Sequence, residues 1–419
     1  MSIIITIIPS ITPLHYITFI SMVSPFGLPR TTITMAHPGT STRSLHADDV
    51  LNIVSDVAPP LHVATTFRYP SDPNLLVPAA DADADADAAA TTSPTSHIYS
   101  RMSAPTPTRY ETILSSLLHG HALSYSSGLS ALHALLTLLN PRSISIGEGY
   151  HGCHGSCAPE DLGPGDVILL ETPVNPKGTA FDIEYFAGKA HARGAVLVVD
   201  GTFAPPGLQE PFAFGADVVL HLGTKYFGGH SDLLSGVLVC RDDDVGRGWY
   251  RQLFEDRVFL GSVMGNMEAW LGVRSLRTLE VRVQRQSGNA ARLVEWLDSA
   301  LRAEGPVAGS VEANVQAVLE EYSAGWGEWL RRQMPNGFGP VFAITMRTER
   351  LARFLPGKLH FFQHATSLGG VESLIEWRTL SDRMVDRRLL RISVGLENWE
   401  DLRADLEGAF AELAVMPEE

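Results

Sequence analysis

Cysteine and positive charge are both scarce in this chain of 419 residues. Its three cysteines, Cys153, Cys157 and Cys240, are too few for a disulfide framework, so we expect a reducing compartment such as the cytoplasm. Lys and Arg number 32 against 47 Asp and Glu, and the net charge of −15 argues against nucleic-acid and membrane partners. Cys153 and Cys157 lie beside His151 and His154, but this spacing matches no common zinc pattern, so we predict no metal site.

The first residues lack the features of a targeting or membrane segment. No Lys or Arg precedes Arg30, whereas a signal peptide begins with a positive charge. Pro9 and Pro13 interrupt any helix long enough to span a membrane. Because Met35 offers a natural start, we assign residues 1–45 to a leader, which is either an extension of the gene model or a disordered tail.

Short apolar runs alternate with helical ones from about residue 120 onward, in a chain whose hydrophobic content of 45% is typical of a globular protein. The predicted strands cover residues 167–170, 195–199, 218–222 and 237–240. A predicted helix over residues 183–193 connects two of them, and this alternation indicates a mostly parallel sheet covered by helices. A long helical stretch over residues 276–303 and a last helix over residues 399–413 indicate a smaller second domain.

Lys225 follows one predicted strand, and Asp200 ends the strand before it. The carboxyl ends of neighbouring parallel strands meet at one edge of a sheet, so these two side chains are expected close together. A desolvated lysine there can hold a carbonyl cofactor as a Schiff base and act as a base, while the carboxylate pairs with a ring nitrogen. The alternative interpretation makes Lys225 a surface charge and Asp200 a helix cap.

Seven separated motifs resemble, in the same order, those of the Cys/Met-metabolism family of pyridoxal phosphate (PLP) enzymes. The similarity is greatest to the fungal type of cystathionine γ-synthase, whose features we recognise in residues 147–152, 333–340 and 375–378. The seven motifs contain Tyr99-Ser100-Arg101, Ser127-Gly128-Leu129, Val174-Asn175-Pro176, Asp200-Gly201-Thr202, Thr224-Lys225-Tyr226, Ser367-Leu368-Gly369-Gly370 and Arg391-Ile392-Ser393.

The resemblance implies a fold-type I PLP enzyme of the α/β class. Its large domain has a mostly parallel sheet, and its smaller C-terminal domain is α+β. After the leader we expect an N-terminal arm over residues 46–110 that contributes to a neighbouring active site. The PLP-binding large domain then covers residues 111–285, and the small domain covers residues 286–419. The resemblance further implies small amino-acid substrates and a homotetramer made of two dimers.

The resemblance also implies a role for each candidate site residue. Lys225 and Tyr150 are the catalytic residues, because Lys225 holds PLP and moves protons while Tyr150 stacks on its ring and can take part in proton transfer. Arg391, with Ser367, is expected to hold the substrate α-carboxylate, since a guanidinium binds a carboxylate bidentately. Asp200 pairs with the ring nitrogen of PLP, and Asn175 binds the ring oxygen. The cofactor phosphate is held by Ser127, Gly128, Leu129 and Thr224. Tyr99 and Arg101 of a neighbouring subunit also reach this phosphate.

The implied reaction is γ-substitution on an activated homoserine, with O-acetylhomoserine as the expected substrate. L-cysteine is the second substrate and cystathionine the product, in trans-sulfuration and methionine biosynthesis. The alternatives are a γ-lyase, a sulfhydrylase or a carbon–carbon bond-forming enzyme, or else an inactive homologue or truncated gene model.

Three departures from the family pattern favour that last alternative or weaken cofactor binding. Leu222 stands where the family has a phosphate-binding serine, and Gly201 stands where asparagine is usual. The segment between Cys153 and Gly165 is too short for the helix, strand and partial helix that the family has there.

Overall fold

The computed structural model describes residues 38–76, 78, 97–146, 161–315 and 327–417. Every element described below belongs to one compact unit, Thr40–Glu419. Residues 1–37 of the expected leader lie outside the described residues. Within this unit, residues 40–46 form helix α1 (Thr40–His46), in which Arg43 donates a hydrogen bond to the carbonyl of Ser116.

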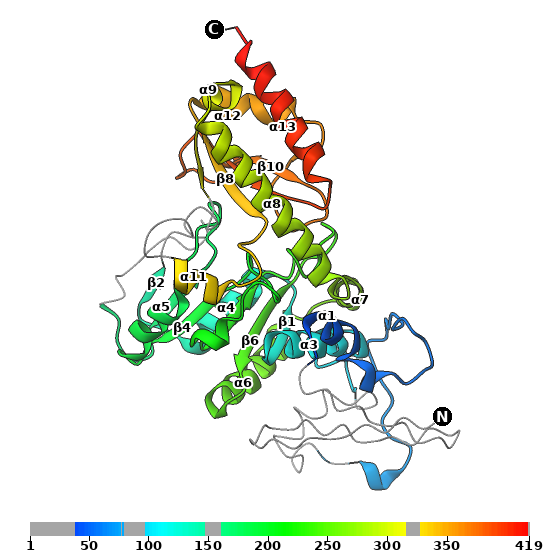
Figure 1. Cartoon of the computed structure of the whole chain (residues 1–419). Helices are drawn as coiled ribbons and strands as arrows, with labels where there is room; N and C mark the ends of the chain where they lie inside the picture. The colour runs from blue at the N-terminus through cyan, green and yellow to red at the C-terminus, as the bar shows by residue number, and fades with distance from the viewer. Residues whose placement is uncertain (1–37, 77, 79–96, 147–160, 316–326, 418–419) are drawn as a thin grey trace, which may run out of the picture. The chain divides into compact units, whose positions relative to one another are not determined.

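Within the described residues, six strands form the first sheet in the order β1-β6-β5-β4-β3-β2 (Figure 1). Strands β2 to β5 pair in parallel, whereas β6 is antiparallel to both β5 and β1. The mostly parallel sheet predicted from the sequence is therefore confirmed. The strands are β1 (Gly120–Tyr125), β2 (Ile144–Ile146), β3 (Val167–Glu171), β4 (Val196–Asp200), β5 (Val218–His221) and β6 (Gly236–Arg241).

Both faces of this sheet are buried, which explains why its strands are continuous apolar runs. Ile168 and Leu170 of β3 pack in one hydrophobic cluster, while Val167 and Leu169 pack in another, because successive side chains point to opposite faces. The first cluster includes residues of α3, α5 and α7, and the second includes residues of α4 and α6. These helices are α3 (Pro105–Leu118), α4 (Gly128–Leu139), α5 (Ile183–His191), α6 (Asp244–Leu260) and α7 (Asn266–Leu276), with 3-10 turns η1 (Asp49–Leu51), η2 (Pro73–Leu75) and η5 (Pro211–Phe214).

A second sheet, five-stranded in the order β7-β8-β11-β10-β9, has its own hydrophobic core. Antiparallel pairs join β7 to β8, β8 to β11 and β11 to β10, and only the short β9 runs parallel to its neighbour. The strands are β7 (Val311–Val315), β8 (Val341–Met346), β9 (Gln363–His364), β10 (Leu374–Trp377) and β11 (Leu389–Ser393). The remaining helices are α8 (Leu279–Leu301), α9 (Pro306–Ser310), α11 (Gly327–Gln333), α12 (Glu349–Phe354) and α13 (Trp399–Ala414), with η6 (Leu355–Lys358) and η7 (Arg378–Leu380).

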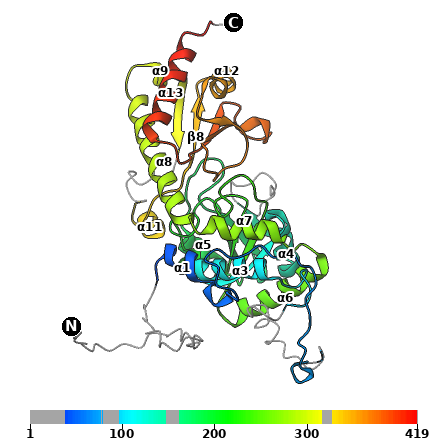
Figure 2. The ribbon, with the colours of Figure 1, turned by 90° about the vertical axis from the view of Figure 1, so that its right-hand side faces the viewer.

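Helix α8 joins the two cores. Leu279 and Val283 pack in a cluster of the first sheet, whereas Leu293 and Leu297 pack in the core of the second. Helices α8 and α13 lie side by side beside the second sheet (Figures 1 and 2). The predicted fold class, an α/β part with a mostly parallel sheet and a smaller α+β part, is confirmed. The boundary expected after residue 285 falls inside α8.

Candidate functional site

A cavity of about 320 Å³ lies at the carboxyl ends of β3, β4 and β5. This edge is where parallel α/β sheets bind their ligands. Arg391 within β11 of the second sheet, and residues that follow β9 and β10, also contribute to its wall. The predicted site residues that line it are Ser127, Gly128, Leu129, Asn175, Asp200, Thr224, Lys225, Ser367 and Arg391.

Lys225 brings its amine into this cavity four residues after β5 ends. Its Nζ donates a hydrogen bond to Ser367 Oγ at 2.9 Å. Burial, together with the positive charges of Arg391 and Arg378, lowers the pKa of Lys225 to about 8, although Glu376 acts in the opposite direction. An amine with this pKa is neutral in about a tenth of the molecules at pH 7, far more often than an ordinary lysine, and the neutral form can act as a nucleophile or a base.

Asp200 presents a carboxylate to the same cavity from the end of β4. Both hydrogen bonds that it accepts, from the N–H and the hydroxyl of Thr202, fall on Oδ1. Burial raises the pKa of Asp200 to about 6, against the effect of these two bonds. A cationic partner facing Oδ2 would stabilise the ionised carboxylate, so the site fits a protonated ring nitrogen.

The amino end of α4 forms another part of the wall. Ser127 caps the helix, because its Oγ accepts a hydrogen bond from Ser130 N at 3.1 Å. Gly128 and Leu129, which follow it, line the cavity with the first turn of the helix. The N–H groups of a first turn have no partner within the helix and carry its positive dipole end, which suits a phosphate.

Leu222 narrows this end of the cavity. A Cβ atom on Gly128 would lie 2.6 Å from Leu222 Cγ, so the leucine side chain packs directly on the first turn of α4. Thr224 lines the cavity too, but its Oγ1 donates to Ser235 O at 3.2 Å and accepts from Ser235 N at 3.0 Å. The structure therefore places an apolar side chain at the position where the resemblance implies a phosphate-binding serine.

Arg391 connects the second sheet to the first. Its Nη1 donates to Asn175 Oδ1 at 3.0 Å, on the loop after β3, and its Nη2 donates to Ser367 O at 2.8 Å. Nη2 also lies 2.5 Å from Glu376 Oε2. Burial lowers the pKa of Arg391 to about 10, which leaves the guanidinium charged at neutral pH. Because Ser367 contacts both Lys225 and Arg391, the amine and the guanidinium are held in one network.

Three polar residues of this region have no role predicted from the sequence. Arg378 and Ser381 line the cavity, and Glu376 lies buried behind them. In the sequence, residues 375–378 indicate only a similarity to one branch of the family, because the pairing of Glu376 with Arg391 needs the register between β10 and β11. The only sign of this arrangement in the sequence is that Arg378 follows Glu376 by two positions at the end of an apolar run.

Two predicted residues lie elsewhere in this chain, and a third cannot be placed. Tyr99 and Arg101 do not line the cavity; Arg101 Nη1 donates to Val258 O at 2.9 Å, and its guanidinium lies 5.6 Å from the centre of the Tyr99 ring. Tyr150 lies outside the described residues, as does most of the short segment from Cys153 to Gly165, which the structure describes only from Asp161 onward.

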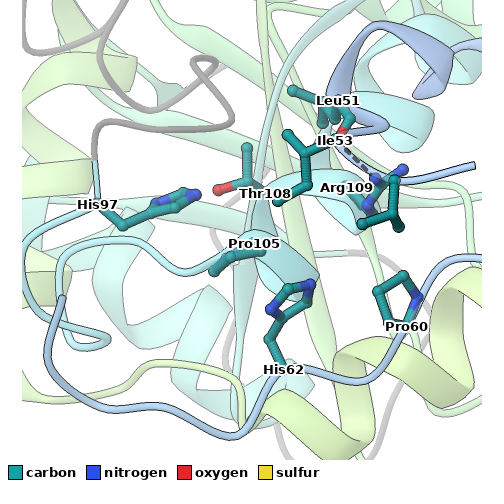
Figure 3. Close-up of a pocket in the computed structure, with 9 residues that line it drawn as sticks. Leu51, Ile53, Pro60, His62, His97, Pro105, Thr108 and Arg109 are labelled. Carbon is teal, nitrogen blue, oxygen red and sulfur yellow. Dashed lines mark hydrogen bonds between the residues drawn. The ribbon is translucent and has the colours of Figure 1, made fainter.

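A second pocket, of about 10 Å³, lies in the N-terminal region (Figure 3). His62, His97 and Arg109 are among its lining residues, and Arg109 pairs with the buried Asp48 at 2.8 Å. Burial is the main cause that lowers the pKa of both histidines. The space suffices for about one water molecule, so this pocket holds no cofactor.

The described residues contain neither a membrane-spanning helix nor a cluster of metal ligands. None of their helices is long and apolar enough to cross a membrane. No group of three or more His, Cys, Asp or Glu side chains among them could hold a metal ion. The cluster of His151, Cys153, His154 and Cys157 considered above lies outside the described residues.

The donor set of the large cavity fits PLP. An amine with a lowered pKa, a buried carboxylate with an available oxygen, and a helix amino end are brought to one space by separate elements. These match the aldehyde, the ring nitrogen and the phosphate of the cofactor, respectively.

Comparisons with known proteins agree with this chemistry. Residues 163–411 match the family described as Cys/Met metabolism PLP-dependent enzyme. A cystathionine γ-synthase of Escherichia coli (strain K12) is 31% identical over 84% of this chain and 93% of its own length. A cystathionine β-lyase of Lactococcus lactis subsp. cremoris is 30% identical over 75% of this chain and 89% of its own length.

Solved structures show the same similarity. The structure of metB from Corynebacterium glutamicum superimposes with a TM-score of 0.75 at 28% identity, covering 90% of this chain and 98% of that one. A methionine γ-lyase from Micromonospora echinospora, solved in its apo form, gives a TM-score of 0.75 at 30% identity, covering 90% of this chain and all of that one.

Proposed function

The chain belongs to the Cys/Met-metabolism family of PLP-dependent enzymes, and on this premise we propose that it catalyses γ-substitution on an activated homoserine. L-cysteine is the proposed nucleophile, O-acetylhomoserine the proposed acceptor, and cystathionine the product. One observation carries the proposal: Ser367 holds the Lys225 amine and the Arg391 guanidinium at the same cavity. An amino acid anchored through its α-carboxylate would thus present its carbon chain to the amine.

The residues around the cofactor would share its binding. Lys225 would hold the carbonyl carbon, and Asp200 the ring nitrogen. PLP, when bound, supplies an electron sink next to the substrate amine. The phosphate would bind at the amino end of α4, at Ser127, Gly128 and Leu129, with Thr224 nearby. Asn175 would bind the ring oxygen through its amide N–H groups, since its Oδ1 already accepts from Arg391.

Proton transfer would fall to Lys225, with Tyr150 stacked on the ring. The amine would take the proton from Cα of the substrate and move protons at Cβ and Cγ, which its pKa of about 8 allows near neutral pH. Arg391 and Ser367 would hold the α-carboxylate meanwhile. In the overall reaction the Cγ–O bond breaks and acetate leaves, the cysteine sulfur forms a bond to Cγ, and the thiol proton is released.

The site would be completed by a second copy of the chain. Tyr99 and Arg101 lie away from the cavity of their own chain, and Tyr99 is 43% exposed. We propose that both residues reach the phosphate of a neighbouring copy, in a dimer of dimers. Co-expressing Lys225→Ala with Arg101→Ala tests this arrangement, because mixed dimers would contain one site with both residues intact. Recovered activity supports the shared site, and none argues against it.

A lyase is the second candidate. Relatives of similar identity are named cystathionine β-lyase and methionine γ-lyase, so the similarity alone does not separate substitution from elimination. Both reactions need the same lysine, carboxylate and arginine. Substitution and elimination differ in the group that attacks the substrate and in the group that leaves it, so measuring the products distinguishes them.

Absorbance spectroscopy of the purified protein with PLP is the first experiment. A visible band that changes on adding O-acetylhomoserine, and that Lys225→Ala lacks, is the expected result. Product analysis with L-cysteine then decides between cystathionine, which supports substitution, and an α-keto acid with ammonia, which supports the lyase. A protein that forms no band even with excess PLP would overturn both proposals and favour an inactive homologue.

A further inference from the structure

Two buried arginines share one buried carboxylate in the wall of the cavity. Glu376 on β10 lies directly opposite Arg391 on β11 in the antiparallel register, and the two side chains form an ion pair. Arg378 begins η7, immediately beyond β10, and its Nη1 lies 3.2 Å from Glu376 Oε2. Ser381 Oγ donates to Glu376 Oε1 at 2.6 Å and accepts from Arg378 Nη1 at 2.9 Å. All three charged side chains are 4% exposed or less.

This arrangement matters because Glu376 opposes the function proposed for Arg391. A guanidinium in contact with a carboxylate forms a neutral pair, which attracts a second carboxylate only weakly in a desolvated site. Glu376 therefore orients Arg391 but also cancels its charge. Arg378 pairs with the same oxygen of Glu376, Oε2, and returns one positive charge, so the three residues together keep a net charge of +1.

The field of these residues reaches the reacting amine. Arg391 and Arg378 both lower the pKa of Lys225, and Glu376 raises it. Arg378 lines the cavity itself, so it lies near any ligand that Arg391 binds. Among the described residues, the only other cationic side chain that lines the cavity is Lys225 itself.

We propose that Glu376 and Arg378 act as one unit on Arg391: Glu376 fixes the orientation of the guanidinium, and Arg378 restores the positive charge that Glu376 would otherwise cancel. Both are positioning residues for the substrate carboxylate. The inference rests on the function proposed above, because it takes Arg391 as the carboxylate site. Its distinctive consequence is that losing Arg378 alone harms carboxylate binding more than losing Arg378 and Glu376 together.

Four variants test this consequence in the PLP-loaded protein: Arg378→Gln, Glu376→Gln, the double variant, and Arg378→Lys. Propionate serves as the probe, because it carries a carboxylate and no amine, and its dissociation constant is measured by calorimetry. Arg378→Gln should weaken propionate binding by about tenfold or more, since it leaves a neutral Arg391–Glu376 pair. The double variant should recover to within about threefold of the wild type, because the net charge of +1 returns. Arg378→Lys keeps the charge and should also stay within about threefold.

Glu376→Gln separates orientation from charge. It leaves two arginines without the carboxylate, so propionate should bind at least as tightly as in the wild type. Turnover of O-acetylhomoserine should nevertheless fall by about tenfold, because Arg391 loses the partner that fixes its direction. A residue with a merely structural role would weaken both binding and turnover.

The outcomes distinguish this inference from the proposed function. If Arg391→Gln leaves propionate binding unchanged, Arg391 is not the carboxylate site and the proposed function loses its anchor. If Arg391→Gln weakens binding but the double variant binds no better than Arg378→Gln, only the present inference is overturned. The same holds if Arg378→Lys behaves like Arg378→Gln. The visible spectrum and thermal unfolding of each variant show whether it is folded. If a glutamine variant does not fold, Arg378→Lys and Glu376→Asp replace it in the test. Glu376→Asp should reduce turnover more than propionate binding, because it shortens the side chain that orients Arg391, and equal losses would overturn the inference.

Discussion

The two ends of the cavity are built on different principles. At the carboxylate end, Arg391, Glu376 and Arg378 are buried, charged and paired within one chain. At the phosphate end, the described residues supply a helix amino end, the engaged hydroxyl of Thr224 and the apolar Leu222, with no cation besides Lys225. Within the described residues, one end of the cavity thus has paired charged side chains for an anionic group, whereas the other end depends on backbone dipoles.

Removing the amine between the two ends should have the largest effect. Lys225→Ala should lower kcat by at least about 10³-fold, since both cofactor attachment and proton transfer would be lost. Thermal unfolding without PLP should stay close to that of the wild type, because a buried amine contributes little stability in exchange for its desolvation. Stopped-time product assays measure the loss. Retention of more than a tenth of the activity would remove Lys225 from its proposed role.

Arg391→Gln should then disable the carboxylate end alone. We expect kcat/KM for O-acetylhomoserine to fall at least about 30-fold, while the affinity for PLP changes little. Arg388→Gln is a matched control, because Arg388 is 34% exposed and pairs with Asp386 at 2.7 Å on the surface. Such surface pairs contribute little, so this control should stay within about twofold of the wild type. Equal losses in both variants would contradict the comparison.

The carboxylate of Asp200, between the two ends, should reveal itself through pH. Its pKa is raised from 3.8 to about 6. Between these two pH values, Asp200 is protonated in the folded protein without PLP but ionised in the unfolded chain. Stability should therefore decrease as pH rises from about 4 to about 6 and stay reduced above that. Asp200→Asn removes this penalty and should stabilise the PLP-free protein at pH 7 by about 1–3 kcal/mol, with no gain near pH 4. Urea unfolding at both pH values measures the difference, and an equal gain at both would contradict the raised pKa.

Replacing Leu222 should strengthen PLP binding at the end of the cavity next to α4. Of the four substitutions, we expect this one to have the smallest effect. Leu222→Ser offers a hydroxyl beside the first turn of α4 and should tighten PLP binding by about tenfold. Leu222→Ala provides the space without the hydroxyl and separates the two causes. Equilibrium titration of the PLP-free protein measures the dissociation constants. If alanine tightens binding as much as serine, the leucine acts only by filling space.

The sequence predicted the structure best where the residue pattern of a single helix or strand was enough to identify it. The apolar runs of β3, β4 and β5 need burial on both faces, so their pattern predicted a helix-covered parallel sheet without any knowledge of contacts. Asp200 ends β4 and Lys225 follows the adjacent strand β5, and the strand ends alone bring them together. The signal was weaker for Tyr99 and Arg101, because the role in a neighbouring copy that is proposed for them leaves no sign in their surroundings within one chain.

The sequence by itself determined the fold class, the family resemblance and the lysine, carboxylate and arginine of the site, because these depend on strand periodicity and short motifs. Only the tertiary structure decided that Glu376 faces Arg391, that Arg378 shares the same carboxylate, and that Leu222 packs on Gly128. Those three facts depend on strand register and on contacts between distant segments. Shifting a strand by one residue would move each side chain to the opposite face, and the pattern within one strand does not identify the residue that lies opposite on its neighbour.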